Sequence, residues 1–157
     1  MSKQKSSAVK IIVDTNIVFS AILNSSGAIG KILLSPNEHF QFYSCEFLRV
    51  EISKHRNKIQ KRTRLSVEEV EELERIVTKN ISFINDYLIP DKIIAETEIL
   101  LAAIDLNDTP FVALATHLKA KLWTGDKELI SGLKAKKFKN VISTNELLVL
   151  FDNLENS

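Results

Sequence analysis

Four acidic residues, far apart in the chain, occupy positions where a divalent cation could be bound. Asp14 directly follows the branched apolar run Ile11–Val13, and Asp126 follows a second apolar run after two small residues. Asp108 stands at the start of a predicted helix, and Glu51 lies within another. Carboxylate oxygens are ligands that Mg²⁺ accepts, and packed carboxylates repel one another unless a cation lies between them. If the fold brings these residues together, the sequence predicts a divalent-metal site.

Each of these acids also has an ordinary structural explanation. Asp14 and Asp108 can cap the helices that follow them by accepting backbone N–H groups, and Glu51 can be a solvated helix residue. A repeated pattern favours the metal site over these structural explanations. An apolar strand, a small polar residue and an acid occur together near Asp14 and again near Asp126.

The elements that must position these acids alternate between strands and helices. Runs of apolar and aromatic residues predict strands at 10–13, 40–44, 83–89, 120–124 and 141–143. Helical spacing predicts two helical segments after Asp14, separated by a break at 24–27. It also predicts helices at 44–64, 67–81, 91–103 and 110–118, a short helix or turn at 127–133, and a final helix from 144. Ser44 and Thr144 are predicted N-caps, and Ser66 with Glu69 forms a predicted capping box. The residues 36–38 are predicted to close the second helical piece.

This alternation predicts a three-layer α/β/α sandwich around a mostly parallel sheet, because parallel neighbours need crossover connections. The uninterrupted run Ile11–Val13 is typical of a strand covered on both faces. Ligands bind at the carboxyl ends of such strands, which is where Asp14 and Asp126 would stand.

Length and composition narrow the class of protein. The 157 residues predict a single domain over 1–157, with loose tails at about 1–8 and 153–157. Hydrophobic content of 45% and charged content of 26% exclude a disordered or fibrous chain. No apolar run approaches the roughly 20 residues that span a bilayer, and Cys45 has no second cysteine to pair with. We therefore expect a cytoplasmic protein without a membrane segment.

Basic residues gather after Glu51 and after Asp126, although the net charge is only +1. The two clusters contain Lys54, Arg56, Lys58, Lys61 and Arg62, and Lys134, Lys136 and Lys137. Both could hold RNA phosphates beside an acidic site, or they could be solvated surfaces. Three histidines, His39, His55 and His117, fit no metal-ligand spacing and are interpreted as surface or structural residues.

Four segments, taken in order, resemble the motifs of PIN-domain ribonucleases. They are Ile12–Val18, Ser44–Glu51, Asp105–Ala115 and Leu122–Lys127, and the resemblance runs from about residue 10 to 151. Within that family the chain looks like the toxin components of bacterial and archaeal toxin–antitoxin pairs, the relatives of VapC toxins.

The resemblance implies a Mg²⁺- or Mn²⁺-dependent site. The family's four acids carry over onto Asp14, Glu51, Asp108 and Asp126, and Asp105 competes with Asp108 for the third position. The small polar residues that line the site in the family correspond to Thr15, Asn16 and Thr124.

The activity that the resemblance implies is hydrolysis of RNA phosphodiester bonds, leaving a 5′-phosphate and a 3′-hydroxyl. A cognate antitoxin and a homodimer are implied as partners. One alternative is a catalytically idle module of the same fold that binds RNA or an antitoxin. Another is a phosphatase of the haloacid dehalogenase class, which the sequence disfavours because Asn16 stands where that class has a second aspartate.

Overall fold

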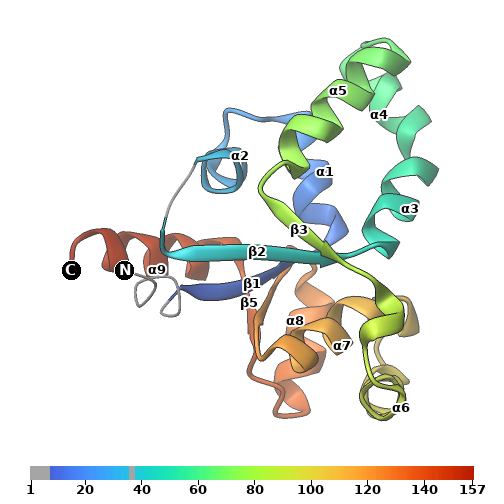
Figure 1. Ribbon diagram of the computed structural model, residues 1–157, viewed down its shortest axis with the longest axis vertical. Coiled ribbons are helices and arrows are strands. Elements are labelled where there is room, and N and C mark those ends of the chain that lie inside the picture. Colours follow the sequence, from blue (N-terminus) through green and yellow to red (C-terminus); the bar gives the residue numbers. More distant parts are fainter. Residues whose placement is uncertain (1–7, 36–37) are drawn as a thin grey trace.

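A five-stranded sheet in the order β3-β2-β1-β4-β5 forms the centre of the computed structural model, which describes residues 8–35 and 38–157 (Figure 1). The strands are β1 Val9–Val13, β2 Phe40–Cys45, β3 Ile81–Ile84, β4 Lys121–Trp123 and β5 Val141–Ile142. Each pairing between neighbouring strands is parallel. The predicted sandwich is confirmed, and its sheet is parallel throughout the described residues.

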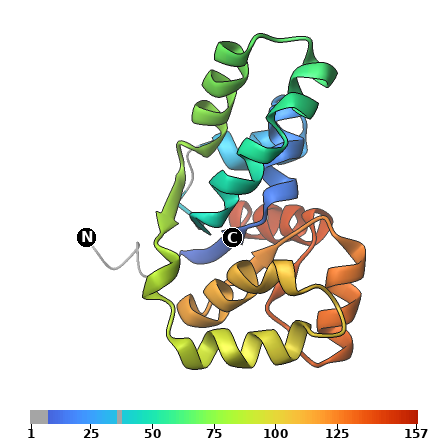
Figure 2. The same ribbon diagram turned by 90° about the vertical axis from the view of Figure 1, so that its right-hand side faces the viewer.

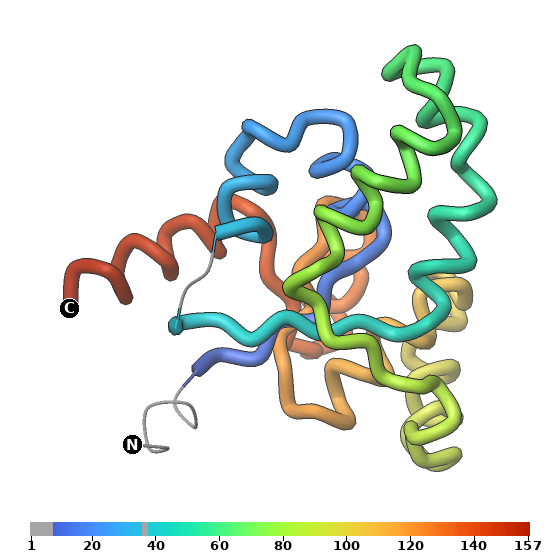
Figure 3. The backbone as a smooth tube through the Cα atoms, turned by 45° about the horizontal axis from the view of Figure 1, so that its top comes forward, coloured from blue at the N-terminus to red at the C-terminus, as the bar shows by residue number. Residues whose placement is uncertain are grey.

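Helices cover both faces of the sheet. The α-helices are α1 Thr15–Leu23, α2 Ala28–Leu34, α3 Phe47–Lys54, α4 Arg56–Thr63, α5 Val67–Thr78, α6 Asp91–Leu101, α7 Thr109–Leu118, α8 Lys127–Ala135 and α9 Thr144–Glu155, with short 3₁₀ helices η2 Asp86–Leu88 and η3 Leu106–Asp108. Figure 1 shows α1 to α5 on one side of the strands and α6 to α8 on the other. Figure 3 shows α9 on the side where β1 and β2 begin, away from the carboxyl ends of the strands.

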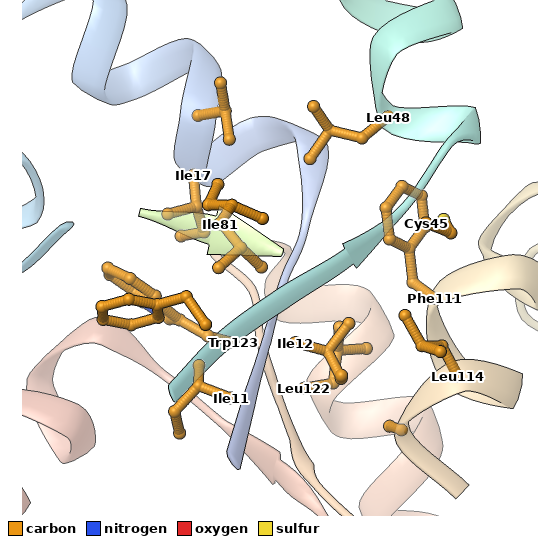
Figure 4. Packing of buried hydrophobic residues seen from close by; sticks show 14 of the residues in the cluster. Ile11, Ile12, Ile17, Cys45, Leu48, Ile81, Phe111, Leu114, Leu122 and Trp123 are labelled. Atoms are coloured by element: carbon orange, nitrogen blue, oxygen red, sulfur yellow. The ribbon is translucent and has the colours of Figure 1, made fainter. Parts of the chain in front are cut away.

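The central strand is buried on both faces because its apolar run has no polar alternation. Ile11, Ile12 and Val13 are each 0% exposed. Figure 4 shows Ile12 beside Leu122 and the residues of α7, whereas Ile17 and Leu48 lie on the opposite side of the strands. This packing fixes the end of β1, and with it the position of Asp14.

The strand order places a topological switch between β1 and β4. From β1 the chain adds β2 and then β3 on one side, and it later returns to add β4 and β5 on the other. The loops at the carboxyl ends of β1 and β4 therefore lead to opposite faces and leave a crevice between them. Asp14 and Asp126 follow these two strands.

Several predicted boundaries are corrected by the structure. The helix predicted over 44–64 is divided at His55 into α3 and α4. Ser44 does not cap it, because this residue belongs to β2 and its hydroxyl donates to the carbonyl of Val13 at 2.8 Å. The strand predicted at 83–89 corresponds to β3, which begins at Ile81, where the stripe of the preceding helix was expected to end, and stops at Ile84. The rest of the predicted span was wrong, because Asp86–Leu88 form the 3₁₀ helix η2.

At the C-terminus, the final helix is capped by Ser143 rather than Thr144. Ser143 and Glu146 form a complete capping box, and the Thr144 hydroxyl instead accepts the indole N–H of Trp123 at 3.0 Å. The tail expected from residue 153 is helical to Glu155, and Leu154 packs against the core. The tail predicted at 1–8 and the turn at 36–38 lie largely outside the described residues, which omit 1–7 and 36–37.

Among the helices in the described ranges, no single one is long and apolar enough to cross a membrane. The bent pair α1 and α2, with 107° between its members, reaches that length and composition only in combination.

Candidate active site

Asp14 is held at the end of β1 by hydrogen bonds to both of its carboxylate oxygens. Oδ1 accepts the backbone N–H of Thr15 at 2.8 Å, and Oδ2 accepts the Thr124 hydroxyl at 2.7 Å. The backbone N–H of Asp14 donates to the carbonyl of Trp123 at 3.1 Å, which joins the ends of β1 and β4. The side chain is 5% exposed, so the carboxylate has a fixed position in a nearly dry environment.

A second set of hydrogen bonds fixes Asp126 relative to the end of β4. The buried Thr124 hydroxyl accepts the backbone N–H of Asp126 at 3.1 Å, and Asn16 Oδ1 accepts that of Gly125, also at 3.1 Å. Asp126 caps α8, because its Oδ1 accepts the N–H of Leu129 at 3.1 Å. This capping bond uses only one of the two carboxylate oxygens of Asp126.

Glu51 reaches the same place from α3. Its Oε1 accepts the hydroxyl of Thr15 at 2.5 Å, a contact between residues 36 positions apart. The β2–α3 connection permits this because a single residue, Glu46, separates the strand from α3, which begins at Phe47 and carries Glu51 one turn further along.

Asp108 is the acid that the structure leaves least satisfied. It is the last residue of η3, directly before α7, and its buried Oδ2 has no hydrogen-bond partner among the described residues. Asp105 is exposed and caps η3 by accepting the N–H of Asn107 at 2.9 Å. Of these two candidates for the third position, Asp108 faces the cleft described next.

One cleft of about 290 Å³ brings the four predicted acids together. Its lining consists of Asp14, Thr15, Asn16, Phe19, Glu51, His55, Lys58, Asp108 and Asp126. The contributing elements meet in Figure 2, where α3 lies above the beginnings of α7 and α8. Four separate segments of the chain therefore each place a carboxylate in this cleft.

Burial and mutual repulsion raise the pKa of two of these carboxyl groups. Desolvation raises the pKa of Asp14 to about 6, with smaller contributions from Glu51 and Asp126, although the hydrogen bond from Thr124 opposes the change. Desolvation also raises the pKa of Asp108 to about 7, reinforced by the charges of Asp14, Asp105, Asp126 and Glu51. The site therefore favours uptake of positive charge, either as protons or as a cation.

The residues present fit a hydrated divalent cation. All the donors are oxygen atoms, as Mg²⁺ prefers, and the unpartnered Asp108 Oδ2 offers one that is already desolvated. No group of three His, Cys, Asp or Glu side chains is arranged to hold one ion within the described ranges. Mg²⁺ commonly takes only one or two carboxylates and keeps several waters, so this arrangement suits it better than an ion that needs a full protein cage.

Among the predicted RNA-binding residues, Lys58 alone lines the cleft in the part of the chain that the structure describes. Arg56 turns toward α5 and donates to Glu74 at 3.1 Å, and Lys134 pairs with Glu146 at 3.7 Å. Lys54, Lys61, Arg62, Lys136 and Lys137 are exposed outside the cleft lining.

Sequence reasoning missed two aromatic residues of the cleft, Phe19 and His55. Phe19 lies four residues after Thr15 on α1, and His55 lies four residues after Glu51 at the end of α3. Residues four apart share one face of a helix, so this spacing could have indicated both. His55 is exposed, as predicted, and it also lines the cleft, which the prediction did not include.

Comparisons with known proteins give the family and the fold of this chain. The family model described as "PIN domain" matches residues 12–146. The fold is similar to a chain of the VapBC2 complex of Rickettsia felis bound to a DNA fragment from its promoter, with 18% identity, a TM-score of 0.65, and coverage of 86% of this chain and 97% of that one. It is also similar to a chain of a toxin–antitoxin complex from Klebsiella pneumoniae, with 19% identity, a TM-score of 0.56, and coverage of 85% and 97%. A comparison with curated protein sequences finds no match. The family match covers most of the chain, including all four acids of the cleft, and the chain belongs to the PIN domain family.

Proposed function

We propose that this protein is a metal-dependent endoribonuclease and the toxin of a toxin–antitoxin pair. The observation that carries the proposal is the single cleft into which Asp14, Glu51, Asp108 and Asp126 converge from separate elements. Such clustering is unfavourable without a cation, and divalent cations are the usual means of hydrolysing phosphodiesters with carboxylates.

Asp14, Asp108 and Asp126 would hold Mg²⁺ or Mn²⁺. When bound, such an ion would activate a water molecule and neutralise the negative charge that develops on the scissile phosphate. The hydroxyl of Thr124 and the N–H of Thr15 keep Asp14 oriented for this task.

Glu51 would orient the attacking water, because its second oxygen is not needed for the hydrogen bond from Thr15. Lys58 is the cation of the cleft lining and would contact a backbone phosphate of the RNA. The products would be a 5′-phosphate and a 3′-hydroxyl.

A cognate antitoxin is the partner that we propose, since the two similar structures are both toxin–antitoxin assemblies. A homodimer of this chain is also proposed, on the resemblance of its motifs to those of toxin components. The proposed place of action is the cytoplasm, where RNA substrates are present.

The deciding experiment compares the purified protein with its Asp14→Asn and Asp105→Asn variants on a mixed RNA pool. We expect cleavage by the wild type in Mg²⁺ or Mn²⁺, loss of cleavage in EDTA, and a loss of at least about 100-fold in Asp14→Asn. Asp105→Asn is the matched control, because Asp105 is exposed and caps η3 outside the cleft lining. Equal cleavage by all three proteins, or cleavage that persists in EDTA, would refute the proposal.

The competing function is a catalytically idle module that binds RNA or an antitoxin. It is favoured by the absence, in residues 8–35 and 38–157, of three side chains already arranged around one ion. This alternative predicts RNA binding that survives Asp14→Asn and no cleavage in any divalent cation.

A further inference from the structure

One wall of the cleft is built from side chains that take no part in the proposed binding of the metal or of the attacking water. Phe19 projects from α1, His55 stands at the junction of α3 and α4, and Lys58 follows on α4. The rings of Phe19 and His55 meet edge to face, with centroids 6.3 Å apart and 84° between their planes. An aromatic pair and a cation therefore lie beside the four carboxylates.

The exposure of this wall differs from that of a core aromatic cluster. Phe19 packs against the hydrophobic core but is only half-buried, and His55 is exposed. His55 stands at the break between α3 and α4, four residues after Glu51 and three before Lys58, and all three residues line the cleft. Aromatic surface is thus available to a molecule that enters the acidic opening.

An edge-to-face aromatic pair is not sufficient to indicate a ligand, and the molecule contains a second one that shows this. His39 and Phe151 have centroids 6.0 Å apart and planes at 82°, but this pair lies where β2 begins, and Phe151 of α9 also contacts Phe40. The Phe19–His55 pair differs in its location, because it lines the cleft that holds the acids.

We infer that Phe19, His55 and Lys58 form a nucleotide-binding subsite, in which a splayed base of single-stranded RNA stacks on the aromatic wall and Lys58 contacts the adjoining phosphate. Bases of single-stranded RNA stack on aromatic side chains, whereas bases inside a duplex are not accessible to them. Stacking tolerates any base, so the subsite would favour unpaired RNA over duplex RNA without a strong sequence preference. The inference rests on the proposed function and adds to it the side chains of this chain that would hold a base beside the cut.

The test measures binding rather than turnover. A short, fluorescently labelled single-stranded RNA is titrated against Asp14→Asn protein in Mg²⁺, and a single abasic nucleotide is moved along the RNA position by position. We expect one position at which loss of the base weakens binding by about fivefold or more, the effect of one stacked base. Adding Phe19→Leu should weaken binding of the intact RNA and abolish the extra loss at that position.

Two further variants separate stacking from general damage to the fold. His55→Gln should reduce the abasic effect as Phe19→Leu does. Phe151→Leu removes the matched aromatic pair away from the cleft and should leave the abasic effect unchanged. Each variant is compared at a temperature well below its own unfolding transition.

The outcomes distinguish this inference from the proposed function. If the wild type cleaves RNA but an abasic nucleotide has the same effect with and without Phe19, the subsite is overturned and the nuclease stands. If Phe151→Leu alters the abasic effect as much as Phe19→Leu, the effect is structural and the subsite is again overturned. If the wild type neither binds nor cleaves RNA, both proposals fail together.

Discussion

The carboxylate of Asp108 combines burial with a missing partner, which is unfavourable in a folded protein unless something else binds there. Its Oδ2 has no hydrogen-bond partner in the described residues, and three neighbouring carboxylates line the same cleft. Buried unpaired charge is among the most destabilising features known in proteins. We interpret Asp108 as a residue that is retained for function at the expense of stability.

This interpretation predicts that Asp108→Asn stabilises the metal-free protein while it abolishes cleavage. The amide can donate to the neighbouring carboxylates and removes one negative charge from the cleft. We expect a gain of about 1 kcal/mol, which corresponds to a rise of about 2–4 °C in Tm for a chain of 157 residues, measured by thermal unfolding in EDTA. A fall in Tm would mean that the Asp108 carboxylate is well accommodated without a cation.

The raised pKa values of Asp14 and Asp108 also predict how stability changes with pH. Because both pKa values lie above the ordinary value of 3.8, the folded state binds more protons than the unfolded state between about pH 4 and about pH 7. The free energy of unfolding contributed by these groups is therefore greatest at the acidic end and is lost as the pH rises toward 7. In EDTA, we expect wild type to lose stability relative to Asp108→Asn across that range. A difference between the two proteins that stays constant with pH would contradict the assignment.

At the residue level, sequence reasoning located acids better than it located their neighbours. Asp14 and Asp126 follow apolar runs, and such runs indicate strands that are buried in the sheet. The choice between Asp105 and Asp108 depends on which face of one short turn points inward, which a single sequence does not determine. The caps at Ser44 and Thr144 were predicted wrongly because tertiary contacts take up both hydroxyls. Ser44 donates to the carbonyl of Val13 from within β2, and Thr144 accepts the indole N–H of Trp123 while its neighbour Ser143 caps the helix.

Among the elements, α3 and α4 show how a charged run is divided between functions. The sequence presents one basic stretch after Glu51, and the break at His55 turns its members in different directions. Arg56 pairs with Glu74 of α5, whereas Lys58 lines the cleft. Helical periodicity alone did not predict this break, because the sequence there contains neither proline nor glycine.

The break at His55 predicts that two lysines of α4 differ in their effect on RNA binding. Lys58→Gln should weaken binding of single-stranded RNA and reduce the salt dependence of binding by about one phosphate contact. Lys61→Gln is the matched control, since Lys61 lies on α4 but is exposed outside the cleft lining. The measurement is the dissociation constant as a function of salt concentration. Equal losses in the two variants would indicate a diffuse electrostatic attraction instead of a specific contact.

At the scale of the whole molecule, the site exists because a parallel sheet collects the ends of strands that are distant in sequence. The order β3-β2-β1-β4-β5 makes β1 and β4 neighbours, although more than 100 residues separate Asp14 from Asp126. Strand–helix alternation was sufficient to predict this sheet edge. It could not predict how far apart the carboxylates stand, since that depends on side-chain conformations set by contacts such as Thr15 with Glu51.

A cation that binds these converging acids should increase the free energy of unfolding of the whole protein, because the unfolded chain does not bring the acids together. An ion that binds only the folded state stabilises it by about 2.7 kcal/mol when its concentration is 100 times its dissociation constant. We expect Mg²⁺ or Mn²⁺ to raise the Tm of the wild type at neutral pH, and to have a much smaller effect on Asp14→Asn and Asp108→Asn, which lack one of the charges that attract it. Asp105→Asn should respond nearly as the wild type does, because Asp105 lies outside the cleft lining and acts on Asp108 only through its charge. An equal rise in all four proteins would show that the cation acts elsewhere on the surface, and the convergence of these carboxylates would then need an explanation other than metal binding.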